Sequence, residues 1–245
     1  LYNNIIANYV AALAGGGISL QDAVRVNTIH NTIVHNDSTA TAGEAFPPGV
    51  PPLSVPQPGA GIAARAHSAE LMQYLTGGQP ADSNPTLTDN IVWQNRQFLF
   101  SGSADGADPN LGQLPYGLCP DLAATPVVDC GLAPPPFDGT QPVFSNLAVL
   151  GAAGTLTCTG CFTDDTADAG LVSDYFNGNR QQGISQNEFT TIQTPAAFDE
   201  GGNFIRLIFG PLTLTYCATA GTPCTDWAVS DHHLLGTSTA IDAGT

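Results

Sequence analysis

Three short segments of this chain share one pattern: two apolar residues, mostly β-branched, followed within a few residues by asparagine. They are residues 4–8 (NIIAN), 31–36 (NTIVHN) and 90–95 (NIVWQN). Isoleucine and valine favour strands, and asparagine tolerates the left-handed backbone of a corner while stacking on asparagine of the next coil. The pattern therefore predicts coils of a parallel β-helix, with the apolar side chains filling the interior.

The spacing of the pattern indicates where the coils are interrupted. Asn8 and Asn36 lie 28 positions apart, close to one solenoid turn, whereas Asn36 and Asn95 lie 59 apart. Six prolines fall within residues 43–61, and an N-cap serine at 68 precedes a short helical pattern. We expect one domain over 1–245, with insertions at about 41–87 and 101–142. We also expect the chain to be a processed piece of a longer one.

Composition excludes several classes of partner. The 245 residues include 21 acidic residues and five arginines but no lysine, so the formal net charge is −16. Nucleic-acid binding requires clustered basic residues, and an anionic membrane surface would repel this chain. No apolar run is long enough for a membrane span. We therefore expect neither nucleic acid nor a membrane as a partner.

The six cysteines form three pairs that are close in sequence: Cys119 with Cys130, Cys158 with Cys161, and Cys217 with Cys224. An even number of cysteines in a chain poor in charge favours an exported protein with disulfides. We expect the three local pairings. The alternative for Cys158 and Cys161, a zinc half-site or redox motif, lacks a second CxxC and a βαβ context.

The C-terminal segment 233–244 (HLLGTSTAIDAG) resembles the H-L-x-x-x-S-x-A-I-D-x-G signature of bacterial right-handed parallel β-helix repeat proteins of the pectin-lyase-like superfamily. The asparagine-rich segments and residues 15–18 (GGGI) resemble repeats of the same proteins, and residues 198–213 look like part of large exported members. The resemblance implies an all-β fold, a right-handed parallel β-helix (solenoid) with long disulfide-bearing loop insertions. It specifies function poorly, because the superfamily holds lyases, hydrolases, adhesins and structural proteins.

The same fold supports polysaccharide-cleaving enzymes, in which inverting hydrolases use paired carboxylates. Asp164, Asp165 and Asp168 form the best local cluster, with Asp199 and Glu200 as further candidates. However, the chain has neither the Gly-His-Gly nor the Arg-Ile-Lys segment of polygalacturonase-like members, and it has no lysine base for a lyase. A lyase, a glycoside hydrolase or a carbohydrate-binding module without cleavage is the alternative to a non-enzymatic role.

Other side chains offer ligand atoms for metal ions or sugars. Calcium takes carboxylate and carbonyl oxygens, which Asp105, Asp108, Asp164, Asp165 and Asp168 offer, although solvated turn aspartates are the simpler interpretation. No cofactor is expected to be required. The histidines at 30, 35, 232 and 233 are poorly spaced for one metal ion. A sugar-stacking row would need the aromatic side chains to be exposed, and strand aromatics are more often core; the candidates are Trp93, Phe98, Phe100, Tyr175, Phe176 and Trp227.

Together these patterns predict an exported, extracellular or cell-surface structural module that acts through its loops and its open solenoid ends. Strand edges at the ends of a solenoid must be capped or paired, and no amphipathic capping helix is visible at either terminus. We therefore expect self-association or contact with another protein chain through an end.

Overall fold

The computed structural model describes residues 1–48, 54–75, 77–101, 117–120, 144–173, 215–217, 227–229 and 231–241. Side chains are described for residues 1–48, 54–75, 77–100, 144–171 and 232–241. Within these residues almost all regular structure is strand, which confirms the predicted all-β class.

Twelve short strands make up three sheets of three strands each and the three parallel strands of a fourth sheet. The first sheet contains β1 (Ile5–Ala7), β5 (Thr32–Val34) and β9 (Ile91–Trp93). The second contains β2 (Val10–Ala11), β6 (Asp37–Ser38) and β10 (Arg96–Ser101). The third contains β3 (Ile18–Leu20), β7 (Ile62–Arg65) and β12 (Leu147–Leu150), and the fourth contains β4 (Asn27–Ile29), β8 (Thr86–Thr88) and β13 (Cys158–Thr159).

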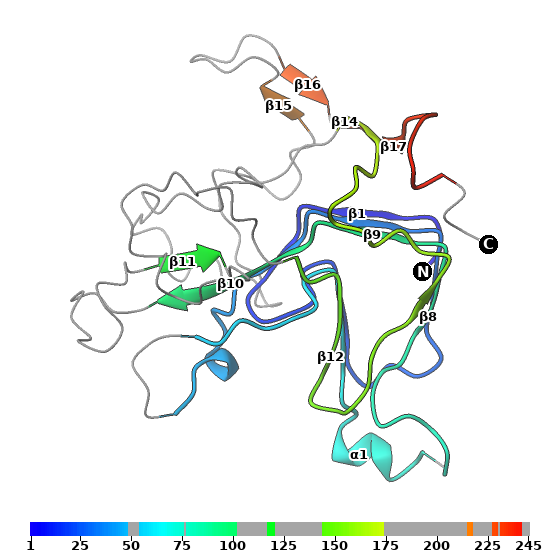
Figure 1. Cartoon of the computed structure of the whole chain (residues 1–245). Coiled ribbons are helices and arrows are strands. Elements are labelled where there is room, and N and C mark those ends of the chain that lie inside the picture. The colour runs from blue at the N-terminus through cyan, green and yellow to red at the C-terminus, as the bar shows by residue number, and fades with distance from the viewer. Residues whose placement is uncertain are drawn as a thin grey trace.

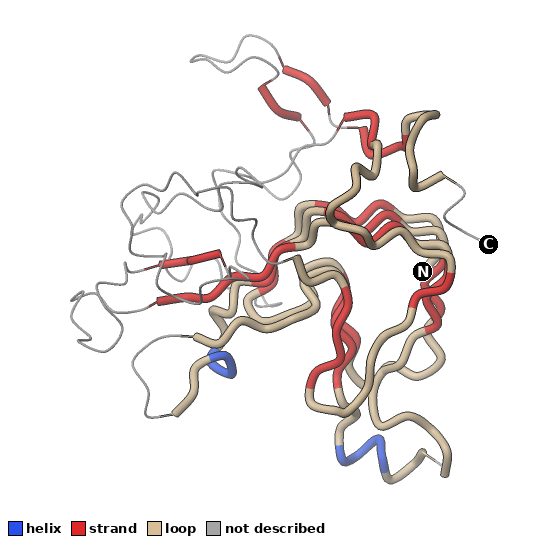
Figure 2. The backbone as a smooth tube through the Cα atoms, in the orientation of Figure 1, coloured by secondary structure: helices blue, strands red, loops and turns tan. Residues whose placement is uncertain are grey.

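The chain visits these four sheets in the same order three times, and every pairing among the twelve strands is parallel. We call each pass a layer: β1–β4 form the first, β5–β8 the second, and β9, β10, β12 and β13 the third. Successive layers follow nearly the same path and stack on one another (Figures 1 and 2). Stacked parallel sheets of this kind are compatible with a parallel β-solenoid.

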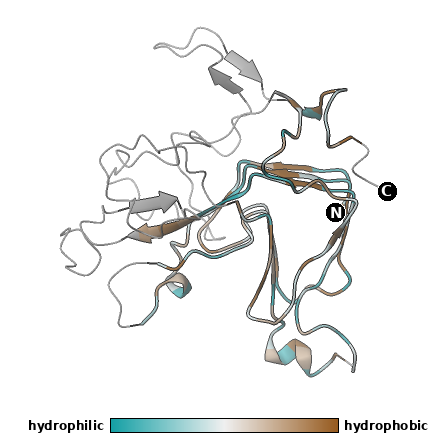
Figure 3. Cartoon of the chain, in the orientation of Figure 1, coloured by the Kyte–Doolittle hydropathy of each residue, from teal (hydrophilic) through white to brown (hydrophobic). Residues whose placement is uncertain are grey.

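Two apolar clusters lie on opposite sides of the first sheet. The larger consists of strand residues from all three layers together with Leu156, which precedes β13, so the predicted interior of aliphatic side chains is present: Ile18, Ile33, Ile62, Ala64, Leu87, Val92 and Leu156. The smaller lies on the other side of the first sheet and contains Val34, Trp93, Phe162, Ala169 and Ala240. Figure 3 shows apolar residues along the stacked strands and polar residues at many of the connections.

Longer connections leave the stack between sheets. The segment before β7 contains a 3-10 helix, η1 (Gly43–Ala45), and the segment after β7 contains α1 (Ala69–Met72), whose N-cap Ser68 accepts a hydrogen bond from the Leu71 N–H at 3.2 Å. This confirms the predicted helical turn. Since β7 lies between β3 and β12, the stack continues through part of the range 41–87 that was expected to be one insertion.

The remaining described strands pair antiparallel. β10 continues beyond β6 and pairs with β11 (Gly117–Pro120). β14 (Leu171–Ser173) pairs with β17 (Asp231–Leu234), and β15 (Thr215–Cys217) pairs with β16 (Trp227–Val229). In the described part of the chain, no helix has the length and apolar character needed to cross a bilayer.

Candidate functional site

The corners at the first sheet place the left-handed residue one position earlier than the sequence predicted. His30, His35, Asp89 and Gln94 have φ between 48° and 58°, and each directly precedes the asparagine that stacks between layers. Among the described residues, the left-handed asparagines are Asn3 and Asn8, both in the first layer. The prediction that the stacking asparagine is also the left-handed residue is therefore wrong. Histidine and aspartate tolerate this backbone as well, which frees the next residue for stacking.

The first column of asparagines consists of Asn4, Asn31 and Asn90, one from each layer. The backbone N–H and the side-chain amide of Asn4 both donate to Oδ1 of Asn31, each at 2.9 Å. Asn31 repeats the arrangement toward Oδ1 of Asn90, at 2.9 and 3.0 Å. At the last layer the Asn90 N–H points at Sγ of Cys161, at 3.2 Å, so the column ends at the Cys158–Cys161 disulfide.

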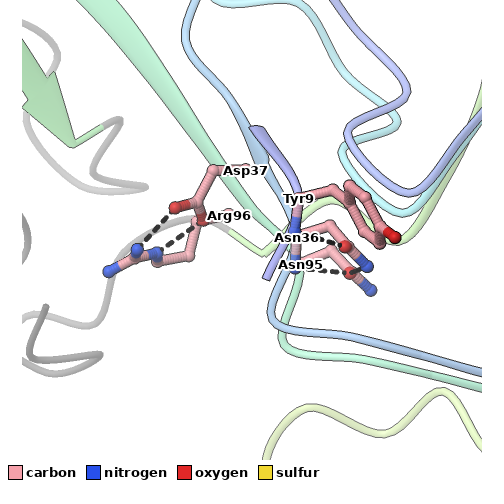
Figure 4. Close-up of polar contacts among 5 residues, drawn as sticks. All are labelled: Tyr9, Asn36, Asp37, Asn95 and Arg96. Atoms are coloured by element: carbon pink, nitrogen blue, oxygen red, sulfur yellow. Dashed lines mark hydrogen bonds and ion pairs between the residues drawn. The ribbon is translucent and has the colours of Figure 1, made fainter. Parts of the chain in front are cut away.

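The second column consists of Asn36, Asn95 and Asn146 and ends at a carboxylate. The N–H and amide of Asn36 donate to Oδ1 of Asn95 at 3.0 and 2.9 Å (Figure 4). The Asn95 amide donates to Oδ1 of Asn146 at 2.8 Å, and the Asn146 amide donates to both oxygens of Asp165 at 3.0 and 2.9 Å. Because a carboxylate only accepts, this column stops at Asp165.

Two glycines let the chain pass close to the second column. A Cβ on Gly61 would lie 2.5 Å from the Asn146 carbonyl and 2.8 Å from the Asn95 amide nitrogen. A Cβ on Gly17 would lie 2.6 Å from the Gly61 carbonyl and 3.0 Å from the Asn36 amide nitrogen. The glycines therefore permit the layer spacing at the start of β3 and β7.

A buried ion pair joins the second sheet beside this column. Arg96 Nε lies 2.8 Å from Asp37 Oδ1, and Nη2 lies 2.6 Å from Oδ2 (Figure 4). Arg96 is 0% exposed and Asp37 is 3% exposed, and the guanidinium also lies 5.0 Å from the centre of the Phe98 ring. The two residues are register partners in neighbouring strands. The pair therefore fixes the register of β6 and β10.

The acidic residues that the sequence suggested for calcium or catalysis have separate partners. Asp165 belongs to the second asparagine column. Asp164 accepts hydrogen bonds from the hydroxyl and N–H of Thr166, which lower the pKa of Asp164, the hydroxyl most strongly. Asp168 accepts the Gly170 N–H at 2.8 Å. Asp105, Asp108, Asp199 and Glu200 lie outside the described residues.

Among described side chains, no three or more His, Cys, Asp or Glu residues are grouped to hold a metal ion. His35 and His232 approach each other, with ring centroids 6.5 Å apart, and His35 also packs against Trp93 at 5.3 Å. Trp93 and Phe98 are buried. They therefore belong to the interior and not to an exposed aromatic row. Tyr175 and Phe176 lie outside the described residues, and Trp227 is described only in its backbone.

Of the predicted disulfides, Cys158–Cys161 is present. Cys119 and Cys217 are described only as backbone within β11 and β15. Cys130 and Cys224 lie outside the described residues.

Among the residues that the structure describes, the first layer has an open strand edge. β1, β2 and β3 each stand at the end of their sheet, with a strand partner on one side. Four of the ten exposed large apolar residues in the described part of the chain fall within its first nine positions: Leu1 (54% exposed), Tyr2 (66%), Ile5 (51%) and Tyr9 (47%). We call β1–β3 with these four residues the first-layer edge.

Comparison of the chain with protein-family models, with curated proteins and with solved structures gave no match. The first-layer edge and the two asparagine columns are thus defined by geometry alone. Sequence reasoning missed Asn146 and Asp165 as members of the second column, because they reach it from a later part of the chain. It also missed the Arg96–Asp37 pair. These two residues lie 59 positions apart, like Asn36 and Asn95, and this shared spacing was the available signal.

Proposed function

We propose that this chain is an exported structural module, built as a right-handed parallel β-helix of the pectin-lyase-like kind, that binds another polypeptide through its first-layer edge. The partner supplies a β-strand that pairs beside β1. The partner is either a second copy of this chain or an unrelated chain. The proposal also places the protein outside the cell.

The repeated order of the four sheets supports the β-helix, because a chain that returns to the same sheet after every fourth strand advances by one layer per pass. The asparagine columns support it further, since stacked amides favour parallel, in-register layers. The disulfide at the end of the first column supports an oxidising location.

The observation that carries the function is the exposed edge itself. An unpaired strand edge offers a row of backbone donors and acceptors to any strand that can align with it. Charged residues, above all lysine, normally protect such edges, and this one instead exposes Ile5 and Tyr9. An edge that is apolar and unprotected is suited to binding.

The test uses a peptide with the sequence of residues 27–38, which forms the second layer beside β1 in this structure. The labelled peptide is titrated with the full chain by fluorescence anisotropy, and hydrogen exchange is followed at the amides of Ile5–Ala7. We expect saturable binding with a Kd on the order of 1 mM or tighter, together with slower exchange in β1.

The matched variants are Ile5→Lys, on the edge, and Val24→Lys, an exposed apolar residue in the connection between β3 and β4. Ile5→Lys should abolish binding and Val24→Lys should preserve it. Unchanged exchange in β1 at saturating peptide, or equal binding by both variants, would contradict the proposal.

A further inference from the structure

The asparagine columns have a direction. Asn31 in the first column and Asn95 in the second each receive two hydrogen bonds at Oδ1 from the preceding asparagine, and each donates its N–H and its amide to the next asparagine. Asn31 shows the complete set: Oδ1 accepts from the N–H and amide of Asn4, while its own amide donates to Asn90 Oδ1 and to the Ile29 carbonyl at 2.9 Å. An asparagine in such a column uses both amide hydrogens and both lone pairs of its oxygen.

Asn4 has only half of this set. Its amide is fully used, since it donates to Asn31 Oδ1 at 2.9 Å and to the Tyr2 carbonyl at 3.1 Å. Its Oδ1 accepts no hydrogen bond from the described residues, and Asn4 is exposed. The first column therefore presents an acceptor at the first-layer edge. The equivalent oxygens of Asn31 and Asn90 each accept two hydrogen bonds from the preceding layer.

The second column has no such acceptor at this edge. The corresponding residue of the first layer is Tyr9, whose backbone N–H donates to Asn36 Oδ1 at 3.0 Å (Figure 4). Tyrosine has no amide oxygen with which to continue the column. Of the two columns, only the first therefore presents a side-chain amide oxygen at the first-layer edge.

The opposite ends of the columns cannot supply the missing donors. The first column ends at the Cys158–Cys161 disulfide and the second at the carboxylate of Asp165, and neither side chain carries an amide. A second copy stacked by this end on the first-layer edge would bring no side-chain amide to Asn4 Oδ1. A partner with its own asparagine-bearing strand would satisfy it.

We infer that the first-layer edge selects a parallel strand of the type Asn-x-apolar-apolar, whose asparagine donates its backbone N–H and side-chain amide to Asn4 Oδ1. This inference rests on the proposed function and narrows its partner. The register between β1 and β5 predicts how the remaining residues of the bound strand align with β1. The two apolar residues of the strand align with Ile6 and Ala7, as Ile33 and Val34 do from the other side.

The test compares three versions of the 27–38 peptide against the full chain by fluorescence anisotropy. Replacing the peptide's Asn31 by leucine removes the donors to Asn4 and should weaken binding about tenfold or more. Replacing its Asn36 by leucine removes an amide opposite Tyr9, where nothing accepts it, and should change binding by less than about twofold. On the protein, Asn4→Leu should reproduce the loss, whereas Asn3→Gly, which keeps the left-handed backbone next to it, should not.

The outcomes separate the two proposals. If the Asn31→Leu peptide binds as tightly as the unchanged peptide, the edge binds strands without recognising asparagine. This inference is then wrong, while the proposed function stands. If no version binds, both are wrong. Sedimentation of the chain alone should show no head-to-tail oligomer, and an oligomer that persists in Asn4→Leu would also overturn the inference.

Discussion

Single asparagine side chains join neighbouring layers by using their whole hydrogen-bonding capacity. Asn95 is 0% exposed, accepts from the N–H and amide of Asn36, and donates to Asn146 Oδ1 and to the Ile33 carbonyl at 3.0 Å. No water is needed to satisfy any of these groups. Buried polar groups of this kind stabilise a fold only while every partner is present.

Removing one interior asparagine should therefore be costly. Asn95→Ala leaves the buried N–H and amide of Asn36 without their acceptor, and we expect the free energy of unfolding to fall by about 2–4 kcal/mol in urea titrations. Asn3→Gly, outside the columns and in the left-handed conformation, should stay within about 0.5 kcal/mol. Equal stabilities for the two variants would show that the columns contribute little.

The stacking of asparagine could be predicted from the sequence, but the identity of the corner residue could not. Counting from Asn8 to Asn36 gives a period of 28, whereas the observed register places Ile5 opposite Thr32, a period of 27. The period is one shorter because Asn8 aligns with His35 and not with Asn36. Asparagine suits both the corner and the column, and sequence alone does not distinguish these roles.

A pH-dependent contact joins α1 to the connection after β3. Asp22 Oδ1 accepts the Ser68 N–H at 2.6 Å, and this bond, with smaller contributions from the Ser68 side chain and from His67, lowers the pKa of Asp22. A lowered folded-state pKa means that the contact stabilises the fold above the ordinary aspartate pKa of about 3.9 and loses this effect as pH falls through the folded value.

We expect a carboxyl titration followed by NMR to give Asp22 a midpoint below about 3.9. The chemical shift of the Ser68 amide should follow the same curve, and Asp22→Asn should remove that dependence. A midpoint at or above the ordinary value would contradict the contact.

Among the elements, β6 and β10 depend on a charged pair that they enclose. Asp37 and Arg96 are opposite each other in register and are buried together, so the removal of one charge takes away the bidentate partner of the other in the interior. Such a loss typically costs more than the net contribution of the pair. The ion pair specifies how the two strands align.

We expect Asp37→Asn to lower the free energy of unfolding by about 3–5 kcal/mol. Glu70→Gln, a carboxylate change on the exposed first turn of α1, should remain within about 0.5 kcal/mol. Combining Asp37→Leu with Arg96→Met should recover most of the loss, because both buried charges are then replaced by apolar side chains. A double variant as unstable as Asp37→Asn would contradict this explanation.

At the level of elements, the sequence predicted the strands of the repeated segments and the helical turn after Ser68. It did not predict β7 inside the expected insertion. Residues 62–65 (IAAR) are rich in alanine, which has low strand propensity, and they form a strand because β3 and β12 pair on both sides. Tertiary pairing decides such a segment, and local preference does not.

For the whole molecule, the two ends of the described stack differ in chemistry. One end finishes its asparagine columns on a disulfide and a carboxylate, and the other presents an unfilled acceptor on Asn4 beside exposed apolar residues. This difference gives the stack a direction. From the proposed function we expect a further strand to add at the first-layer edge and not at the other end.

The most direct measurement adds such a layer by design. A variant with a second copy of residues 1–27 placed before Leu1 continues the 27-residue register, so that Asn4 of the added layer donates to the native Asn4. Hydrogen exchange at the amides of Ile5–Ala7 should slow at least tenfold, and an added layer with its Asn4 replaced by leucine should lose most of that protection. If the added layer leaves exchange in β1 unchanged, or protects it equally with and without its asparagine, the first-layer edge does not accept an asparagine-bearing strand.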